Sequence, residues 1–198
     1  DGIWISFSMK KEMHDDAPLV VVKKKINPEW TFEETVREIQ GGIKKGREGA
    51  KSVSDKEMDL VFLFPMFMVS FFTWLLRTLN HFGWLPLSMI KADELYSSVF
   101  IANLGSIGLQ PAYHHLYEWG DTPIFMALGT NEPRMALDER GRPAVKDMMT
   151  IKYSFDERVN DGFYSIKALE LLKNLVENPE MVLEKEPDKT QTEEALGI

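Results

Sequence analysis

The chain opens with a two-residue alternation of apolar and polar positions over residues 3–9, which predicts a half-buried β-strand. Residues 19–22 form a short continuous apolar run that predicts a second strand, and Asn27-Pro28 ends it. A polar, turn-rich stretch covers residues 131–146, and its segment 138–143 (DERGRP) predicts a hairpin tip. Three later segments predict further strands: residues 98–102, 123–128 and 149–155.

Two capping boxes predict the starts of helices. Thr31 and Glu34 have the spacing at which a hydroxyl and a carboxylate satisfy the first free amides, and this helix is expected to run to about residue 45. Ser54 and Glu57 repeat the spacing and open an apolar helical region that reaches about residue 82. Gly83 and Pro86 are expected to end that region.

A third helix is expected over residues 161–177, with Asn178-Pro179 as its stop. Its apolar side chains fall on one stripe: Phe163, Ile166, Leu169, Leu172 and Val176. Strands and helices alternate without an internal repeat or a clear linker. The sequence therefore predicts one α/β domain over residues 1–183, followed by a charged, disordered acidic tail over 184–198.

Residues 60–76 (LVFLFPMFMVSFFTWLL) are uncharged and could be taken for a membrane span. The stretch is shorter than the roughly 20 apolar residues that a spanning helix needs. Pro65 is expected at the first position of a helix rather than inside one. We therefore expect a buried or interface helix, with a membrane-surface helix and a true span as the alternatives, and membrane association is not expected.

Charge and composition exclude some classes of function. With 198 residues and 44% hydrophobic content, the chain can bury one sizeable core. The net charge of -8 argues against a nucleic-acid partner, although Lys23, Lys24 and Lys25 could form the edge of a pocket for an anion. The absence of cysteine excludes disulfides, thiol nucleophiles and cysteine-ligated metals. A reducing cytoplasmic location is the default expectation.

Three blocks occur in one order along the chain: residues 98–105 (SVFIANLG), 123–129 (PIFMALG) and 149–162 (MTIKYSFDERVNDG). They resemble the chloramphenicol acetyltransferase and dihydrolipoyl acyltransferase superfamily, whose signature is Asp-His-Arg-Val-x-Asp-Gly. The resemblance covers most of residues 1–183. It implies an α/β two-layer sandwich with a mixed sheet covered by helices, and places an opening helix and strand of the family upstream of residue 1. It also implies coenzyme A as substrate and a homotrimer, or a multiple of three, with other subunits of an acyltransferase complex as possible partners.

The resemblance assigns the chemistry of that family to two positions at a subunit interface. The signature histidine removes a proton from a thiol or hydroxyl, and a hydroxyl of the Phe-Thr-Ile-Ser-Asn strand stabilises the tetrahedral oxyanion. Here Glu157 stands in place of the histidine and Ala102 in place of the hydroxyl, with Asn103 next to it. Three other signature residues match: Arg158, Asp161 and Gly162. In that family, the aspartate before the glycine holds the loop by ion pairing.

Both departures weaken the inherited reaction. Removal of one oxyanion donor typically lowers the rate by about 100- to 1000-fold. A carboxylate has an ordinary pKa near 4.3 against about 8.5 for a thiol, so the proton transfer is unfavourable by about four powers of ten. The sequence therefore favours a silent or strongly impaired structural subunit of the acyltransferase fold. The alternative is an active coenzyme-A-dependent acyltransferase that uses Glu157, His114 or His115 as its base.

His114 and His115 are the other candidates for proton transfer, because histidine titrates near neutral pH. Their neighbours Tyr113, Tyr117 and Trp119 could line a pocket or simply pack a polar loop. Adjacent histidines are expected to point in different directions, so a metal would need a further ligand such as His81 or Glu118. The spacing does not require one, and no metal site is predicted.

Two features remain open. Ser106 lies four residues after Ala102 and could supply the missing hydroxyl, whereas the glycines of segment 103–108 (NLGSIG) are expected to form a tight turn rather than a phosphate loop. The apolar stretch 62–84 contains more aromatic residues than one helix face needs. We expect it to pack against another subunit, with a lipid or an acyl chain as the alternatives.

Overall fold

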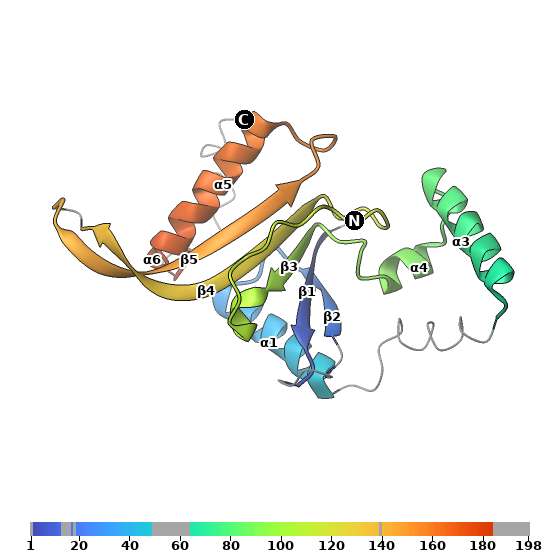
Figure 1. The fold of residues 1–198 in the computed structure, drawn as a ribbon, viewed down its shortest axis with the longest axis horizontal. Helices are drawn as coiled ribbons and strands as arrows, with labels where there is room; N and C mark the ends of the chain where they lie inside the picture. The colour runs from blue at the N-terminus through green and yellow to red at the C-terminus, as the bar shows by residue number, and fades with distance from the viewer. Residues whose placement is uncertain (1, 13–16, 18, 49–63, 139, 184–198) are drawn as a thin grey trace.

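A computed structural model describes residues 2–12, 17, 19–48, 64–138 and 140–183 (Figure 1). Its strands form one mixed sheet in the order β2-β1-β3-β4-β5. The three inner strands run parallel to one another, and the two outer strands are antiparallel to their neighbours. The strands are β1 (Ile3–Lys10), β2 (Leu19–Ile26), β3 (Val99–Asn103), β4 (Ile124–Leu137) and β5 (Pro143–Phe155). The expected α/β fold with a mixed sheet is confirmed.

Helix α1 (Phe32–Glu48) begins at the first predicted capping box. The Glu34 amide donates to the Thr31 hydroxyl at 3.2 Å, and the Glu34 carboxylate accepts from the Thr31 amide at 3.0 Å. The helix lies against β2, where Gly42 and Gly46 face the side chain of Val22. The other helices are α3 (Met66–His81), α4 (Leu87–Ala92), the 3₁₀ turn η1 (Leu104–Ile107), α5 (Gly162–Glu177) and α6 (Glu180–Leu183).

The strand register separates the two faces of the sheet. Phe7 is near Gly42 and therefore lies on the face that α1 covers. Its neighbour Ser6 points to the opposite face, where it is fully buried. Ser6 and Ser8 are in register with the main buried cluster, so that cluster lies on this second face. We call it the site face, and it carries Phe100, Ala102, Phe125, Ala127, Lys152 and Ser154.

Strands β4 and β5 are longer than predicted. The segment 131–146, expected to be mostly turn, is largely strand, and the two partners pair from Asn131↔Met149 to Leu137↔Pro143. The hairpin tip is where the sequence placed it, and the Asp138 amide donates to the Arg142 carbonyl at 2.8 Å. This part forms a two-stranded ribbon that extends beyond the other strands (Figure 1). Its side chains are mostly exposed, so polar composition did not distinguish it from a loop.

Helix α3 begins later than the predicted apolar region. Pro65 is its N-cap rather than its first helical residue, and Gly83 follows its end as expected. The second capping box, Ser54 with Glu57, and residues 60–63 lie outside the described residues. Within the described part of the chain, no helix is long and apolar enough to cross a membrane.

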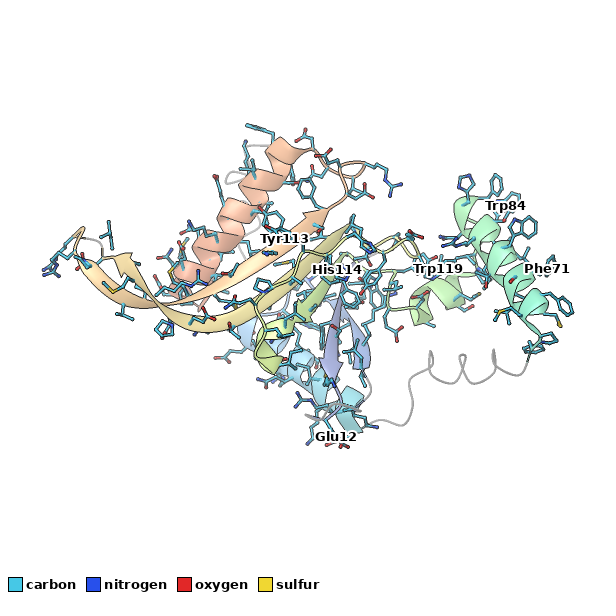
Figure 2. The ribbon with its side chains drawn as sticks, viewed as in Figure 1. Glu12, Phe71, Trp84, Tyr113, His114 and Trp119 are labelled. Carbon is cyan, nitrogen blue, oxygen red and sulfur yellow. The ribbon has the colours of Figure 1, made fainter. Side chains whose placement is uncertain are left out.

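The apolar side chains of α3 are exposed in the single chain, with 74% of Phe67 and 60% of Trp74 accessible to solvent. A helix buried on all sides within its own subunit is therefore excluded. Figure 2 shows Phe71 on α3, and Trp84 just after its end, away from the sheet. The helix is held to the rest of the chain by polar contacts, since the Tyr96 hydroxyl donates to Asn80 at 2.7 Å.

The predicted apolar stripe of α5 is only partly correct. Phe163, Ile166 and Val176 are exposed, whereas Leu169 and Leu172 are half-buried and Ser165 is buried. The helix is rotated so that Ser165, rather than Phe163, faces inward, because a small side chain permits a closer approach. The predicted acidic tail, residues 184–198, lies outside the described residues.

Candidate active site

Two rows of side chains cross the site face. In one row Phe100 is in register with Phe125, which is in register with Ser154. In the next row Ala102 is in register with Ala127, which is in register with Lys152. Neighbouring strands lie about 4.8 Å apart, so the backbone at Lys152 is about 10 Å from the backbone at Ala102, the candidate oxyanion position. Only Ala127 lies between them in this row.

The loop over residues 109–123 crosses this face and brings His114 onto it. The imidazole of His114 stacks on Phe125 with ring centroids 3.9 Å apart and an angle of 6° between the planes. The Ser154 hydroxyl donates to the main-chain carbonyl of His114 and so ties the loop to β5. Tyr117 packs edge-on against Phe100 at 5.3 Å. Figure 2 shows Tyr113 and His114 over the central strands.

A main-chain hydrogen bond determines the tautomer of His114. Its Nδ1 lies 2.5 Å from the carbonyl oxygen of His115. A carbonyl can only accept, so Nδ1 carries the proton in neutral imidazole and Nε2 is the basic nitrogen. His115 makes the same kind of contact, with its Nδ1 2.7 Å from the Leu116 carbonyl. The two rings lie 5.5 Å apart at 27°, so the expected divergence of the pair is wrong.

A cavity of about 210 Å³ opens beside His114. A space of this size can admit a small ligand group. Ala127 forms part of its lining, and Tyr113 and Lys152 contribute a phenol and an ammonium. The Lys152 ammonium lies 3.6 Å from the centre of the Tyr113 ring, in a cation–π contact.

Glu157 does not line this cavity. It is exposed in the turn between β5 and α5, and within the described residues it makes no hydrogen bond or ion pair. The neighbouring Arg158 pairs with Asp156 at 2.6 Å, and its hydrogen bonds lower the pKa of Asp156 to about 2. Asp161 accepts the Tyr164 amide at 2.9 Å and caps α5. Among the described residues of the single chain, Asp161 acts as a helix cap, and no cation pairs with it there.

Ala102, Asn103 and Ser106 lie at the end of β3. Ala102 is buried. The Ser106 hydroxyl donates to the Asn103 carbonyl at 2.7 Å, and the Ser106 amide donates to the Asn103 side chain at 3.1 Å. Ser106 is exposed and its hydroxyl proton is already used within η1, so the structure gives no support to Ser106 as the replacement donor.

The glycines of this segment have different roles. Gly108 has φ +78° and forms the turn that the sequence predicts. A Cβ on Gly105 would lie 2.2 Å from the Gly129 carbonyl oxygen, so Gly105 is needed for close approach of η1 to β4. The tight-turn prediction is therefore right for Gly108 and incomplete for Gly105.

A second cavity, of about 710 Å³, opens on the same face near the start of β1. Lys23 and Lys25 line it and lie 5.2 and 5.9 Å from the Trp4 ring centre. Burial lowers the pKa of Lys23, whose ammonium donates to the Ile90 and Asp93 carbonyls, both at 2.8 Å. Lys24 pairs with Glu38 at 2.6 Å, so two of the three predicted lysines form this edge.

Lys152 and Ser154 were missed as site residues, although the strand pattern contains a signal. Thr150, Lys152 and Ser154 alternate with apolar residues, which places three polar groups on one face of β5. Only the tertiary structure shows that this face is the one the loop of His114 covers. Among the described residues, no group of three potential metal ligands gathers.

The mixed sheet and its helices define the class of protein: an α/β protein with the fold of an acyltransferase catalytic domain. Residues 89–184 match the family model of the 2-oxoacid dehydrogenases acyltransferase (catalytic domain). The chain is thus related to that catalytic domain, and the resemblance found in the sequence is confirmed. The fold is similar to a probable dihydrolipoamide acetyltransferase from Listeria monocytogenes 4b F2365, with a TM-score of 0.55 and 19% identity over 89% of this chain and 56% of that chain.

A second similar structure is the dihydrolipoamide acetyltransferase of Azotobacter vinelandii, with a TM-score of 0.55 and 15% identity. The match covers 91% of this chain and 56% of that chain. The chain therefore spans a little over half the length of the solved structures it matches. A comparison with curated proteins gives no match.

Proposed function

We propose that this chain carries out coenzyme-A-dependent acyl transfer, with His114 as the base and position 157 without a catalytic role. The observation that supports this most is the hydrogen bond from Nδ1 of His114 to a main-chain carbonyl. It leaves Nε2 as the proton acceptor of a histidine that lines a cavity. In the part of the chain that the structure describes, Glu157 has neither a side-chain partner that orients it nor a place in that cavity.

The chemistry requires a base and a confined space for the reacting groups. Coenzyme A supplies a thioester or a thiol as substrate. His114 accepts the thiol proton at Nε2, and its imidazolium returns a proton to the departing thiolate. The stacked Phe125 ring and the Ser154 hydroxyl hold the imidazole and its backbone in place, which reduces the motion lost on reaching the transition state.

The related enzyme from Azotobacter vinelandii was studied for the roles of a serine, a histidine and an asparagine in its catalytic mechanism. The histidine and the asparagine of that enzyme are four residues apart. Glu157 and Asp161 have the same separation here. This supports the proposal that Glu157 occupies the position of the inherited base and that proton transfer has moved elsewhere.

The second cavity has the chemistry that the anionic end of coenzyme A requires. Lys23 and Lys25 flank the indole of Trp4, which combines positive charge with a flat aromatic surface. Phosphate groups favour ammonium partners, and a purine ring favours an aromatic face. We propose that these residues bind the nucleotide portion of the substrate, on the same face of the sheet as His114.

A second candidate function is a silent structural subunit, as the sequence favoured. Exposed aromatic side chains on α3, including Phe67, Phe71 and Trp74, support it because large apolar patches mark interfaces. In this case residues 1–183 would act as one assembly domain and join copies of the chain, or other acyltransferase subunits, into trimers.

Acetyl transfer from acetyl-coenzyme A to dihydrolipoamide, measured for matched variants, separates the two candidates. We expect His114→Gln to lower kcat by about 100- to 10,000-fold, the usual contribution of general base catalysis. Glu157→Gln should remain within about twofold of the unsubstituted chain, because the residue lies outside the cavity. His115→Gln is the control for changes to the loop.

An unsubstituted chain without turnover would overturn the catalytic proposal and favour the silent subunit. Loss of activity in Glu157→Gln with normal activity in His114→Gln would return the base to position 157. Thermal unfolding of each variant shows whether a loss of rate reflects a loss of folded protein.

A further inference from the structure

We propose that Lys152 stabilises the tetrahedral oxyanion of the acyl-transfer reaction, in place of the hydroxyl that residue 102 lacks. The inference rests on the proposed function and assigns it a second catalytic residue. The group it would bind is the carbonyl oxygen of a thioester as negative charge develops on it.

The position of Lys152 on the sheet favours this role. Ala102, Ala127 and Lys152 form one cross-strand row, so all three side chains emerge on the site face. The flexible four-carbon stem of a lysine can extend back over Ala127 towards Ala102. A larger residue than alanine at position 127 would block that path. The row therefore permits the Lys152 ammonium on β5 to approach an oxyanion bound near Ala102 on β3.

The charge of Lys152 also favours this role. Among the described residues no carboxylate pairs with Lys152, and its ammonium lies instead 3.6 Å over the Tyr113 ring. A ring contact attracts the cation without neutralising it. The same cavity contains His114, so an unneutralised positive charge and a base lie beside one space. That combination suits a reaction in which a proton leaves and an oxyanion forms.

Two serine hydroxyls near this row already have partners within the chain, which favours the ammonium as the donor. Ser154 lines the cavity, but its hydroxyl proton is donated to the His114 carbonyl. The hydroxyl proton of Ser106 is donated to the Asn103 carbonyl. Neither can donate to an oxyanion without breaking the bond that holds its loop.

In the proposed step, the thiol proton moves to Nε2 of His114 and the sulfur lone pair attacks the thioester carbon. The carbonyl π pair moves onto oxygen, and the Lys152 ammonium donates a hydrogen bond to that oxyanion. Collapse re-forms the carbonyl and breaks the original C–S bond. The departing thiolate takes the proton from His114. Lys152 keeps its own protons throughout.

The first test compares Lys152→Met with Lys146→Met, a lysine on the same strand whose position in the ribbon is far from the cavity. We expect Lys152→Met to lower kcat by about 100- to 1000-fold, as for loss of an oxyanion donor. KM and the calorimetric affinity for coenzyme A should change by less than about threefold, because the interaction forms only in the transition state. Lys146→Met should behave as the unsubstituted chain.

The chain contains no cysteine, which permits a chemical rescue at this one position. Treatment of Lys152→Cys with 2-bromoethylamine joins an aminoethyl group to the sulfur with loss of bromide and restores an ammonium at nearly the original length. Iodoacetamide adds a neutral group of similar size. We expect the first reagent to restore at least about a tenth of the rate and the second to restore none.

Normal turnover of Lys152→Met, or equal rescue by both reagents, would overturn the inference. If the unsubstituted chain is inactive, the proposed function fails, and the role of Lys152 fails with it. If the chain is active and depends on His114 but not on Lys152, only the oxyanion assignment fails. Circular dichroism of each variant identifies any loss caused by unfolding.

Discussion

At the scale of single residues, Gly105 and Gly129 permit close packing of η1 and the His114 loop against β4. A Cβ on Gly105 would lie 2.2 Å from the carbonyl oxygen of Gly129, and a Cβ on Gly129 would lie 2.4 Å from the Pro111 ring. The first contact joins η1 to β4, and the second joins β4 to the loop that carries His114. The position of the candidate base therefore depends on backbone packing as well as on its own hydrogen bonds.

Gly105→Ala should destabilise the fold by about 1–3 kcal/mol, because the backbone must move to admit the methyl group. Gly41→Ala is the matched control, since nothing lies within 4 Å of a Cβ at that helical position. The control should stabilise the protein by about 0.5–1 kcal/mol through the unfolded state. Chemical denaturation measures both, and a neutral Gly105→Ala would contradict the close-approach account.

The sequence identified Glu157 and Ala102 because a short ordered motif fixes their positions along the chain. It named His114 only as an alternative, and it missed Lys152. The stacking of His114 on Phe125 depends on the path of the loop between them, which has no regular structure. Periodicity predicts which face of a strand a side chain occupies, but it does not predict what covers that face.

At the scale of elements, the start of α5 depends on Asp161. Its carboxylate accepts the Tyr164 amide and satisfies one of the free donors of the first turn. This role differs from the ion pair that the family resemblance implies. Asp161 therefore contributes to stability through α5, the helix that it caps.

Asp161→Ala should lower the free energy of unfolding by about 1 kcal/mol, the usual effect of removing an N-cap. Asp161→Asn should have little effect, because an amide oxygen can accept the same hydrogen bond. Urea titration of the two variants tests this. A large loss in Asp161→Asn would show that the charge matters and would favour an ion pair over a cap.

The attachment of α3 should depend on pH through Tyr96. Burial, and then the negative charges of Asp93 and Asp121, raise the pKa of Tyr96 to about 12. The folded state thus favours the neutral phenol, which donates to Asn80. A raised pKa contributes stability that is complete below the ordinary value near 10 and declines as the pH rises towards 12.

We expect the stability advantage of the unsubstituted chain over Tyr96→Phe to shrink by about 1 kcal/mol between pH 9 and pH 11. The phenylalanine variant has no phenol to titrate, and its lysines titrate as in the unsubstituted chain. The difference in free energy of unfolding between the two proteins therefore reports the phenol alone. Denaturant unfolding at several pH values provides the measurement. A constant difference would show that the phenol is not shielded from water.

The boundaries of elements were predicted well where capping residues or strand alternation act locally. The capping box of α1 and the hairpin tip at Asp138 are examples, and both are confirmed by hydrogen bonds. The outer parts of β4 and β5 were missed because strand pairing alone, without burial, holds their polar residues. The sequence predicted the wrong inward face of α5, because apolar residues occupy more of the helix surface than the sheet can cover.

At the scale of the whole molecule, apolar surface is left exposed on both α3 and α5. Phe67 and Trp74 on α3 and Phe163 on α5 are exposed by 74%, 60% and 74%. Single chains rarely leave such aromatic groups open to water, because their burial contributes about 1.5–3 kcal/mol per side chain. This supports an assembly in which copies of the chain cover these surfaces.

We expect a homotrimer or a multiple of three, since cyclic closure buries the same surface on every copy. Native mass spectrometry at micromolar concentration should detect it. The double substitution Phe67→Glu with Trp74→Glu should shift the population towards monomer, whereas Lys146→Met should not. A clean monomer of the unsubstituted chain would contradict the prediction.

The central claim is that the thioester end of the substrate meets His114. S-Bromoacetyl-coenzyme A tests it directly, because a bound haloacetyl group alkylates a neighbouring imidazole and the chain offers no cysteine to compete. Peptide mass spectrometry should find the label on His114 rather than on His14, His81 or His115, and an excess of coenzyme A should prevent the reaction. Labelling confined to Glu157, or labelling of all four histidines that coenzyme A does not prevent, would contradict the account.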